Sequence, residues 1–320
     1  MEILLICPKL SEYYKDFISI IEKKGDHVLW YRDGMDFAPF RKKIFKKSCS
    51  KKIDKYIDNI IEKNNQIKFD EIIIINGTNL AMKHVQKLKK EFKCKFIFYA
   101  WDSIINYPNI KTFYNLFDCC YSFDKIDCEK YGFKFLPLFY SKNMTLETPK
   151  YDLSSIMSYN EKKYNSYLKI KKCIPDNIKT NEYLFVASKI KFYFNRFLMK
   201  KEYTILDKKF VKFKKISKNE AYFFMLDSKV VLDCPRDGQN GLTIRTFETL
   251  NFNRKLITTN KNIKDYDFYN EKNIFVIDDT VKKIPLSFFT DEFDKNYCLG
   301  KEYSIENFVN VLFYSKEKVE

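Results

Sequence analysis

The chain has 320 residues, of which 45% are hydrophobic and 31% charged, and its formal net charge at pH 7 is +16. This length suffices for two ordinary domains with separate cores, and the charge predicts attraction to phosphorylated substrates, anionic lipids or nucleic acid. Because no run of about 20 uncharged apolar residues occurs, the sequence excludes a membrane-spanning helix.

The N-terminus and the cysteines indicate a cytoplasmic protein. The opening MEILLICPKL has no basic region and is typical of a first strand rather than a signal peptide. Nine cysteines form no CxxC pair, and only two histidines are present. We therefore expect reduced, structural thiols and neither a disulfide framework nor a zinc site.

The first half of the chain alternates strands with helices. Apolar runs of strand length predict strands at residues 3–7, 28–31, 72–75, 96–99, 117–122 and 133–138. Helical spacing of apolar residues predicts helices at 11–24 and 80–92. This βαβ pattern requires a parallel sheet with right-handed crossovers. We expect a Rossmann-like α/β domain over residues 1–145.

A basic segment, Phe40–Lys52, lies between the second and third predicted strands and mixes lysines with phenylalanine and isoleucine. Such a segment can rest on an anionic membrane surface, here the inner face of the membrane. A solvated helix face is the alternative, because lysine is frequent throughout the chain. We expect no nucleic-acid partner, because no ribonucleoprotein, KH or helix-turn-helix motif accompanies the charge.

The second half restarts the alternation after a polar linker at residues 141–152. Strands are predicted at 153–157, 183–187, 230–232, 254–259 and 274–277, and helices at 159–172 and 304–313. Ser217 and Glu220 have the spacing of a capping box before a helix that ends near Leu226. We expect a second Rossmann-like domain over residues 146–303 and a C-terminal helix over 304–320.

Residues 230–259 form the most informative stretch and read as strand, glycine loop, helix, strand. A helix that begins after Gly241 would present free N–H groups and the positive end of its dipole to a phosphate. Thr243 adds a hydroxyl and Arg245 a guanidinium. Glu248 could accept hydrogen bonds from the two hydroxyls of a ribose. An ordinary helix start with a surface Arg and Glu fits the spacing equally well.

Four stretches resemble GT-B glycosyltransferases, in particular the CgeB-like and capsular or lipopolysaccharide-biosynthesis group. They are GLTIRTFETLNFNRKLITTNKNI (241–263), YAWDSI (99–104), FDCCYSFDKIDCEKYGFKFLPLFY (117–140) and KNIKDYDFYNEKNI (261–274). The resemblance implies two Rossmann-like domains facing a cleft, an acceptor-side domain over residues 1–145 and a nucleotide-sugar donor domain over residues 146–303. It also implies that the C-terminal helix over 304–320 packs back on the first domain. It also implies that Gly241, Leu242 and Thr243 bind the donor diphosphate and that Glu248 binds the ribose.

The resemblance implies transfer of a sugar from a nucleotide-sugar to a surface-glycan or lipid-linked acceptor. Arg245 or Arg236 would stabilise the departing diphosphate, and no metal is expected. Asp265-Tyr266-Asp267 matches the DxD pattern of a metal-binding motif. It lies in a polar loop, so we do not expect it to bind a metal. A transferase that uses another nucleotide-activated donor, or a non-catalytic nucleotide- or glycan-binding protein of the same fold, are the alternatives.

One segment departs from the family pattern. Relatives carry a Gly-Ser turn after the first strand of the second domain, whereas this chain has MSYNEK at residues 157–162. The glycine that eases close approach of the backbone to phosphate is missing. Ser158 and Lys162 are the residues that could substitute for it.

Asp102, in YAWDSI, is the candidate general base because it follows a strand and should face the cleft. Capping of a following helix is the alternative role for this side chain. Asp124 is expected to cap a helix over residues 125–131. His27 precedes a strand and His84 lies inside a helix, so we expect both histidines to be structural.

Overall fold

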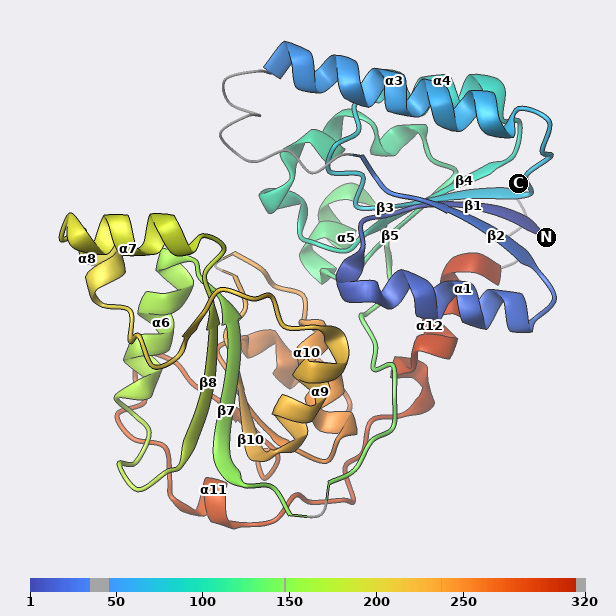
Figure 1. The fold of residues 1–320 in the computed structure, drawn as a ribbon. Coiled ribbons are helices and arrows are strands. Elements are labelled where there is room, and N and C mark those ends of the chain that lie inside the picture. Colours follow the sequence, from blue (N-terminus) through green and yellow to red (C-terminus); the bar gives the residue numbers. More distant parts are fainter. Residues whose placement is uncertain (35–45, 147, 237, 315–320) are drawn as a thin grey trace. The chain divides into compact units, whose positions relative to one another are not determined.

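The computed structural model describes residues 1–34, 46–146, 148–236 and 238–314, which form two compact units (Figure 1). The first unit comprises Met1–Leu138 and the C-terminal segment from Ser304, and the second comprises Phe139–Tyr303. Residues 40–45 of the basic segment Phe40–Lys52 lie outside the described residues, and the rest of the segment belongs to a helix. Every helix within the described ranges is too short or too polar to pass through a bilayer.

The first unit is built on a six-stranded parallel sheet in the order β2-β1-β3-β4-β5-β6. Its strands carry isoleucine-rich runs that are buried on both faces, as a parallel sheet covered by helices requires. The strands are β1 (Glu2–Ile6), β2 (His27–Tyr31), β3 (Glu71–Ile75), β4 (Lys95–Ala100), β5 (Cys119–Ser122) and β6 (Lys134–Phe135).

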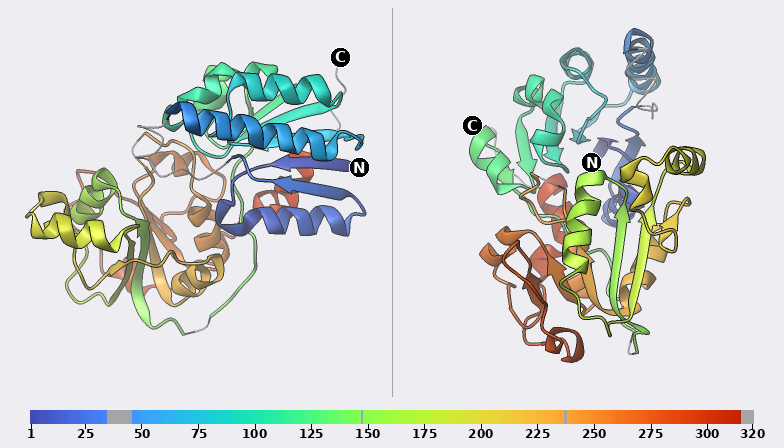
Figure 2. Two further views of the ribbon diagram at one scale, coloured as in Figure 1. Left: turned by 45° about the horizontal axis from the view of Figure 1, so that its top comes forward. Right: turned by 90° about the vertical axis from the view of Figure 1, so that its left-hand side faces the viewer.

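Helices cover both faces of this sheet (Figures 1 and 2). One face carries α3 (Lys46–Asn64) and α4 (Met82–Glu91), and the other carries α1 (Tyr13–Lys23) and α12 (Ile305–Tyr314). Helix α5 (Lys125–Tyr131) follows β5. The C-terminal helix therefore belongs to the first unit, although the second unit separates it from the rest of that unit in sequence.

The second unit is built on another six-stranded parallel sheet, in the order β12-β11-β10-β7-β8-β9. Its order, counted within the unit, is the 3-2-1-4-5-6 arrangement of a Rossmann sheet. The strands are β7 (Tyr151–Ser158), β8 (Thr180–Phe185), β9 (Val211–Lys212), β10 (Ser228–Asp233), β11 (Lys255–Thr258) and β12 (Ile274–Val276).

The two faces of the second sheet bury separate apolar clusters. One is covered by α6 (Glu161–Lys171) and α11 (Ser287–Thr290), and the other by α9 (Lys218–Leu226) and α10 (Ile244–Asn251). Two helices that the sequence did not predict, α7 (Lys189–Phe197) and α8 (Lys201–Thr204), project at one extremity of the unit.

Several local predictions are confirmed. The Ser217 hydroxyl accepts the N–H of Glu220, and the Glu220 carboxylate accepts the N–H of Ser217, so the capping box forms. Asp124 caps α5 by accepting the N–H of Ile126 at 3.1 Å. His84 is structural, because its ring accepts the N–H of Ala81. Apart from this, eight cysteines carry free thiols: Cys7, Cys94, Cys119, Cys120, Cys128, Cys173, Cys234 and Cys298.

The junction between the units lies at Leu138 and Phe139, several residues before the expected boundary at 145. Hydrogen bonds fasten the next residues to the second unit. The Tyr140 N–H donates to the Tyr303 carbonyl at 2.9 Å, and Asn251 donates from its side chain to the Lys142 carbonyl at 2.7 Å. A polar composition alone could not show that this segment is held by specific bonds.

Phe308 of α12 is the residue that should matter most for docking this helix. It is 1% exposed, its ring lies 5.5 Å from that of Phe17 in a stacked pair, and it meets Tyr99 edge-to-face at 4.9 Å. Phe308→Ala should lower the free energy of unfolding of the first unit by about 3–5 kcal/mol. Urea unfolding followed by tyrosine and tryptophan fluorescence measures the change. Phe197→Ala, at a side chain that is 82% exposed, is the control and should change it by less than about 0.5 kcal/mol.

Candidate functional site

The strand order of the second sheet reverses between β7 and β10. From β7 the chain moves outward through β8 and β9, and from β10 it moves the other way through β11 and β12. Ligands of open parallel sheets bind beyond the carboxyl ends of the strands at such a reversal, because the connecting segments diverge there. The residues that follow β7 and β10 are therefore the place to look for a site.

Asp233, the last residue of β10, is the centre of this region and is 1% exposed. The Arg245 guanidinium donates to one carboxylate oxygen at 2.6 Å, and the Thr243 hydroxyl donates to the other at 2.5 Å. Burial raises the pKa of Asp233, but the charges of Arg245 and Lys163 and these hydrogen bonds outweigh it. The net result is a lowered pKa and an ionised carboxylate.

Lys163, in the first turn of α6 after β7, faces the same carboxylate. Burial lowers the pKa of its ammonium, the Asp233 charge opposes this shift, and the charges of Arg245 and Arg236 reinforce it. Among the described residues, no acceptor forms a hydrogen bond or salt bridge with the Lys163 ammonium. Two cations, Lys163 and Arg245, thus act on one carboxylate, and the excess positive charge favours an anionic ligand.

Helix α10 begins at Ile244, two residues later than an immediate start at Leu242 after Gly241. Thr243 is its N-cap and accepts the N–H of Thr246. Within the described part of the chain, the N–H groups of Ile244 and Arg245 meet no acceptor. Two free amides therefore lie beside the Arg245 side chain, at the positive end of the helix dipole.

The loop before α10 is held in place from the next strand connection. Asn260, after β11, donates from its side chain to the carbonyls of Asn240 at 3.0 Å and Gly241 at 3.2 Å. Asn262 donates to the Asn240 carbonyl at 3.1 Å. These bonds satisfy the loop's carbonyl groups from one side, so the loop keeps its shape without a ligand.

The structure places the other predicted donor residues at or near this edge of the sheet. Arg236 is exposed in the loop after β10, and Ser158 is exposed at the end of β7. Lys162 is exposed on the outer side of α6, next to Lys163. Glu248 lies one turn along α10 from Arg245 and is only 4% exposed, so its role toward a ribose stays a prediction.

The predicted base, Asp102, belongs to the first unit and lies in the loop after β4. It is half-buried, and the Asn76 side-chain amide donates to its carboxylate at 2.9 Å. The Asn76 carbonyl oxygen in turn accepts the N–H groups of Trp101 at 2.8 Å and Asp102 at 3.1 Å. Asp102 is therefore an oriented carboxylate and does not cap the short helix that follows.

Sequence reasoning missed Asp233 and Lys163, although signals for both are present. Asp233 directly ends the buried run 230–232, at the end of a parallel strand where ligands bind. Lys163 precedes the buried Tyr167 and Ile170 by four and seven residues, which places it on the inward stripe of α6. The neighbouring Lys162 lies off this stripe.

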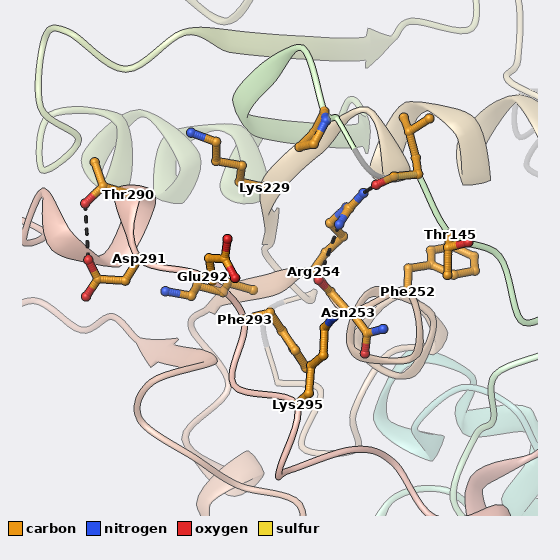
Figure 3. Close-up of a pocket in the computed structure, with 13 residues that line it drawn as sticks. Thr145, Lys229, Phe252, Asn253, Arg254, Thr290, Asp291, Glu292, Phe293 and Lys295 are labelled. Carbon is orange, nitrogen blue, oxygen red and sulfur yellow. Dashed lines mark hydrogen bonds between the residues drawn. The ribbon is translucent and has the colours of Figure 1, made fainter.

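A hollow of about 690 Å³ occupies the opposite edge of the second sheet (Figure 3). Its lining includes Lys229, Arg254 and Lys255, which lie at the amino ends of β10 and β11. The Arg254 guanidinium is already used: two of its nitrogens donate to the Leu226 carbonyl at 3.1 and 2.9 Å. Because the Arg254 guanidinium is used and the free amides at the start of α10 lie at the carboxyl edge, the carboxyl edge is the better candidate site.

Comparison with known proteins identifies the fold. No family model and no curated protein matches the sequence. Sucrose-phosphate synthase from Thermosynechococcus elongatus matches with a TM-score of 0.59 at 10% identity, over 98% of this chain and 95% of that one. The galactosyltransferase WaaB of the lipopolysaccharide outer core matches with 0.53 at 10% identity, over 98% and 94%.

A third solved structure is the UDP-GlcNAc 2-epimerase of Methanocaldococcus jannaschii in complex with UDP-GlcNAc and UDP. It matches with a TM-score of 0.53 at 12% identity, over 98% of this chain and all of that one. The two parallel sheets and these matches show the GT-B fold of two Rossmann-like domains. At such low identity the likeness defines the fold and no activity.

Asp233→Asn should destabilise the second unit by about 3 kcal/mol near pH 7. Removing one partner of a buried ion pair costs roughly 3–5 kcal/mol, and the 24% exposure of Arg245 reduces that cost. Because the pKa of Asp233 is lowered on folding, the loss should be complete above about pH 4 and shrink as the pH falls further. Urea unfolding at several pH values measures it.

Asp279→Asn is the matched control. This carboxylate belongs to an exposed pair with Lys169, so its removal should change stability by less than about 1 kcal/mol. Equal stability of Asp233→Asn and the wild type near pH 7 would contradict the buried, ionised state of Asp233.

Proposed function

We propose that the protein is a glycosyltransferase that moves a sugar from a nucleotide-diphosphate donor to a surface-glycan or lipid-linked acceptor, without a metal ion. The single observation that supports this function is the set of cations and free amides at the strand reversal of the second unit. Lys163 and Arg245, with the first N–H groups of α10, match a pyrophosphate in charge and in hydrogen-bond donors.

The proposed roles follow from the chemistry of the step. An acceptor hydroxyl oxygen attacks the anomeric carbon, the bond from that carbon to the phosphate oxygen breaks, and the nucleoside diphosphate leaves with the electron pair. Lys163, Arg245 and Arg236 stabilise the negative charge that develops on the leaving group. Asp102 accepts the proton of the acceptor hydroxyl in an inverting reaction.

The remaining donor contacts are assigned by the sequence resemblance. Gly241, Leu242 and Thr243 lie beside the diphosphate, and Glu248 binds the ribose. Ser158 and Lys162 stand where relatives carry the glycine turn. The resemblance also favours the CgeB-like or polysaccharide-biosynthesis group. WaaB, which shares the fold, acts on lipopolysaccharide, and this supports a surface-glycan acceptor.

A non-catalytic nucleotide- or glycan-binding protein of the same fold is the second candidate. Two observations favour it: MSYNEK replaces the glycine turn, and Glu248 is 4% exposed. A site built in this way could bind a diphosphate and still hold the sugar too loosely for transfer. Binding and turnover therefore have to be measured separately.

Thermal-shift measurements with UDP, GDP, CMP and their sugars test the donor site. The matching nucleotide, at about 100 times its Kd, should add roughly 2.7 kcal/mol to the stability of the second unit and raise Tm by several degrees. Lys163→Ala should weaken this binding about 10- to 100-fold, because a charge-assisted hydrogen bond contributes roughly 1.5–3 kcal/mol.

Lys169→Ala on the same helix is the control and should bind as the wild type does, since Lys169 is 74% exposed and pairs with an exposed aspartate. Equal nucleotide affinity of the Lys163→Ala and Lys169→Ala variants would contradict the proposed site. If none of the nucleotides raised Tm, the proposed donor-binding function itself would be contradicted.

Asp102→Asn tests the base. The substitution keeps the shape of the side chain and its bond from Asn76, but an amide cannot accept the proton. We expect kcat for sugar transfer to fall by a factor of about 100 or more, while the nucleotide-induced Tm shift stays unchanged. Asp58→Asn, at an aspartate 42% exposed and paired with Lys87, is the control. Unreduced kcat in Asp102→Asn would exclude this residue as the base.

A further inference from the structure

Helix α7 and the residue pair after it expose an apolar surface that the proposed catalytic step does not use. Six large hydrophobic side chains between residues 190 and 199 are exposed, and we call them the α7 patch: Ile190, Tyr193, Phe194, Phe197, Leu198 and Met199. Ile190 and Phe197 are 84% and 82% exposed. Soluble proteins scatter single exposed apolar residues, whereas a contiguous group of this kind marks an interaction surface.

The exposure is fixed by how the opposite face of α7 packs. Phe192 is 1% exposed and its ring meets that of Phe213 at 5.5 Å. The Arg196 guanidinium donates to the carbonyls of Tyr203 and Leu206, both at 2.9 Å. With this face anchored, residues spaced by four and three positions, such as 190, 194 and 197, must point outward.

The segment that carries the patch is basic, and Glu202 directly follows it. Residues 187–201 contain five basic side chains and no acidic one. Arg196 is engaged by backbone carbonyls, and the other four are exposed lysines: Lys189, Lys191, Lys200 and Lys201. Apolar and aromatic side chains bordered by lysines suit the interface of an anionic bilayer, where rings enter the headgroup region and ammonium groups meet phosphates.

We propose that the α7 patch docks on an anionic lipid surface. A protein partner would also cover apolar side chains. The four exposed lysines beside these side chains, however, favour a partner whose surface is negatively charged throughout. This surface lies in the second unit and is distinct from the basic segment Phe40–Lys52 of the first unit. It places the lipid contact on a helix that the apolar periodicity of the sequence did not reveal.

The proposed docking surface lies at the same edge of the second sheet as the candidate site. Helix α7 begins four residues after the end of β8, which is parallel to β7. The Tyr159 hydroxyl, in the turn after β7, donates to the Glu202 carbonyl of α8 at 2.8 Å. A lipid-linked acceptor would thus reach the protein at the same edge of the second sheet that binds the donor. This link to the acceptor rests on the proposed function, whereas lipid docking itself does not.

Vesicle binding of the full-length protein tests the proposal. The probes are vesicles of phosphatidylcholine with phosphatidylglycerol and vesicles of phosphatidylcholine alone, in a flotation assay. The wild type should prefer the anionic vesicles, and the preference should weaken when NaCl rises from about 0.1 M to about 0.5 M. The double variant Phe194→Ser, Phe197→Ser should lose affinity at least about tenfold.

Two further variants complete the test. Lys189→Ala with Lys191→Ala should lower the affinity for anionic vesicles by a factor of about five for each lysine. Phe223→Ser removes an equally large exposed ring, 62% exposed on α9, and should leave vesicle binding unchanged. Nucleotide-induced Tm shifts are measured on every variant. They show that the second unit is folded, and they test nucleotide binding at the donor site independently of vesicle binding.

Three results would overturn the proposal. Vesicle affinity of the Phe194→Ser, Phe197→Ser variant equal to that of the wild type would place any lipid contact elsewhere. Equal binding to neutral and anionic vesicles would remove the role of the lysines. Failure to bind vesicles, together with a dimer that light scattering detects in the wild type and not in the double variant, would assign the patch to a second copy of the chain.

Discussion

The ion pair between Asp233 and Arg245 is the interaction on which the candidate site depends. A buried carboxylate without cations would be costly, and clustered cations without a carboxylate would repel each other. Together with Lys163 they form a cluster that is held in place and still carries excess positive charge. An arrangement of this kind needs no reorganisation when an anion arrives, because protein bonds already fix the guanidinium.

The two edges of the second sheet use similar side chains in opposite ways. At the amino edge, Arg254 donates to the Leu226 and Leu146 carbonyls, so it ties the segment that joins the units to the sheet. At the carboxyl edge, the Lys163 ammonium has no acceptor among the residues that the structure covers. The hollow at the amino edge has a volume of about 690 Å³, but its arginine already donates to carbonyl groups. Unsatisfied donors, not cavity size, distinguish a site that can bind an anion.

Aromatic packing holds the C-terminal helix in the first unit. Phe308 brings the C-terminal helix against Phe17 and Tyr99, and Trp101 lies next to this group. Asp102 directly follows Trp101, and Asn76 binds the N–H groups of both residues. The orientation of the predicted base therefore depends on the same packing that anchors the end of the chain, although the two features are far apart in sequence.

The sequence by itself determined the alternation of strands and helices, the two Rossmann-like domains and the caps at Asp124 and Ser217, because these follow from local periodicity and capping chemistry. It also singled out Thr243 and Arg245, since both lie next to the glycine loop. Only the tertiary structure decided that Lys163 rather than Lys162 meets Asp233, and that α7 turns its apolar face outward. Both outcomes depend on which side of a helix is covered by strands distant in sequence, and one residue of helical phase, about 100° of rotation, separates a buried side chain from an exposed one.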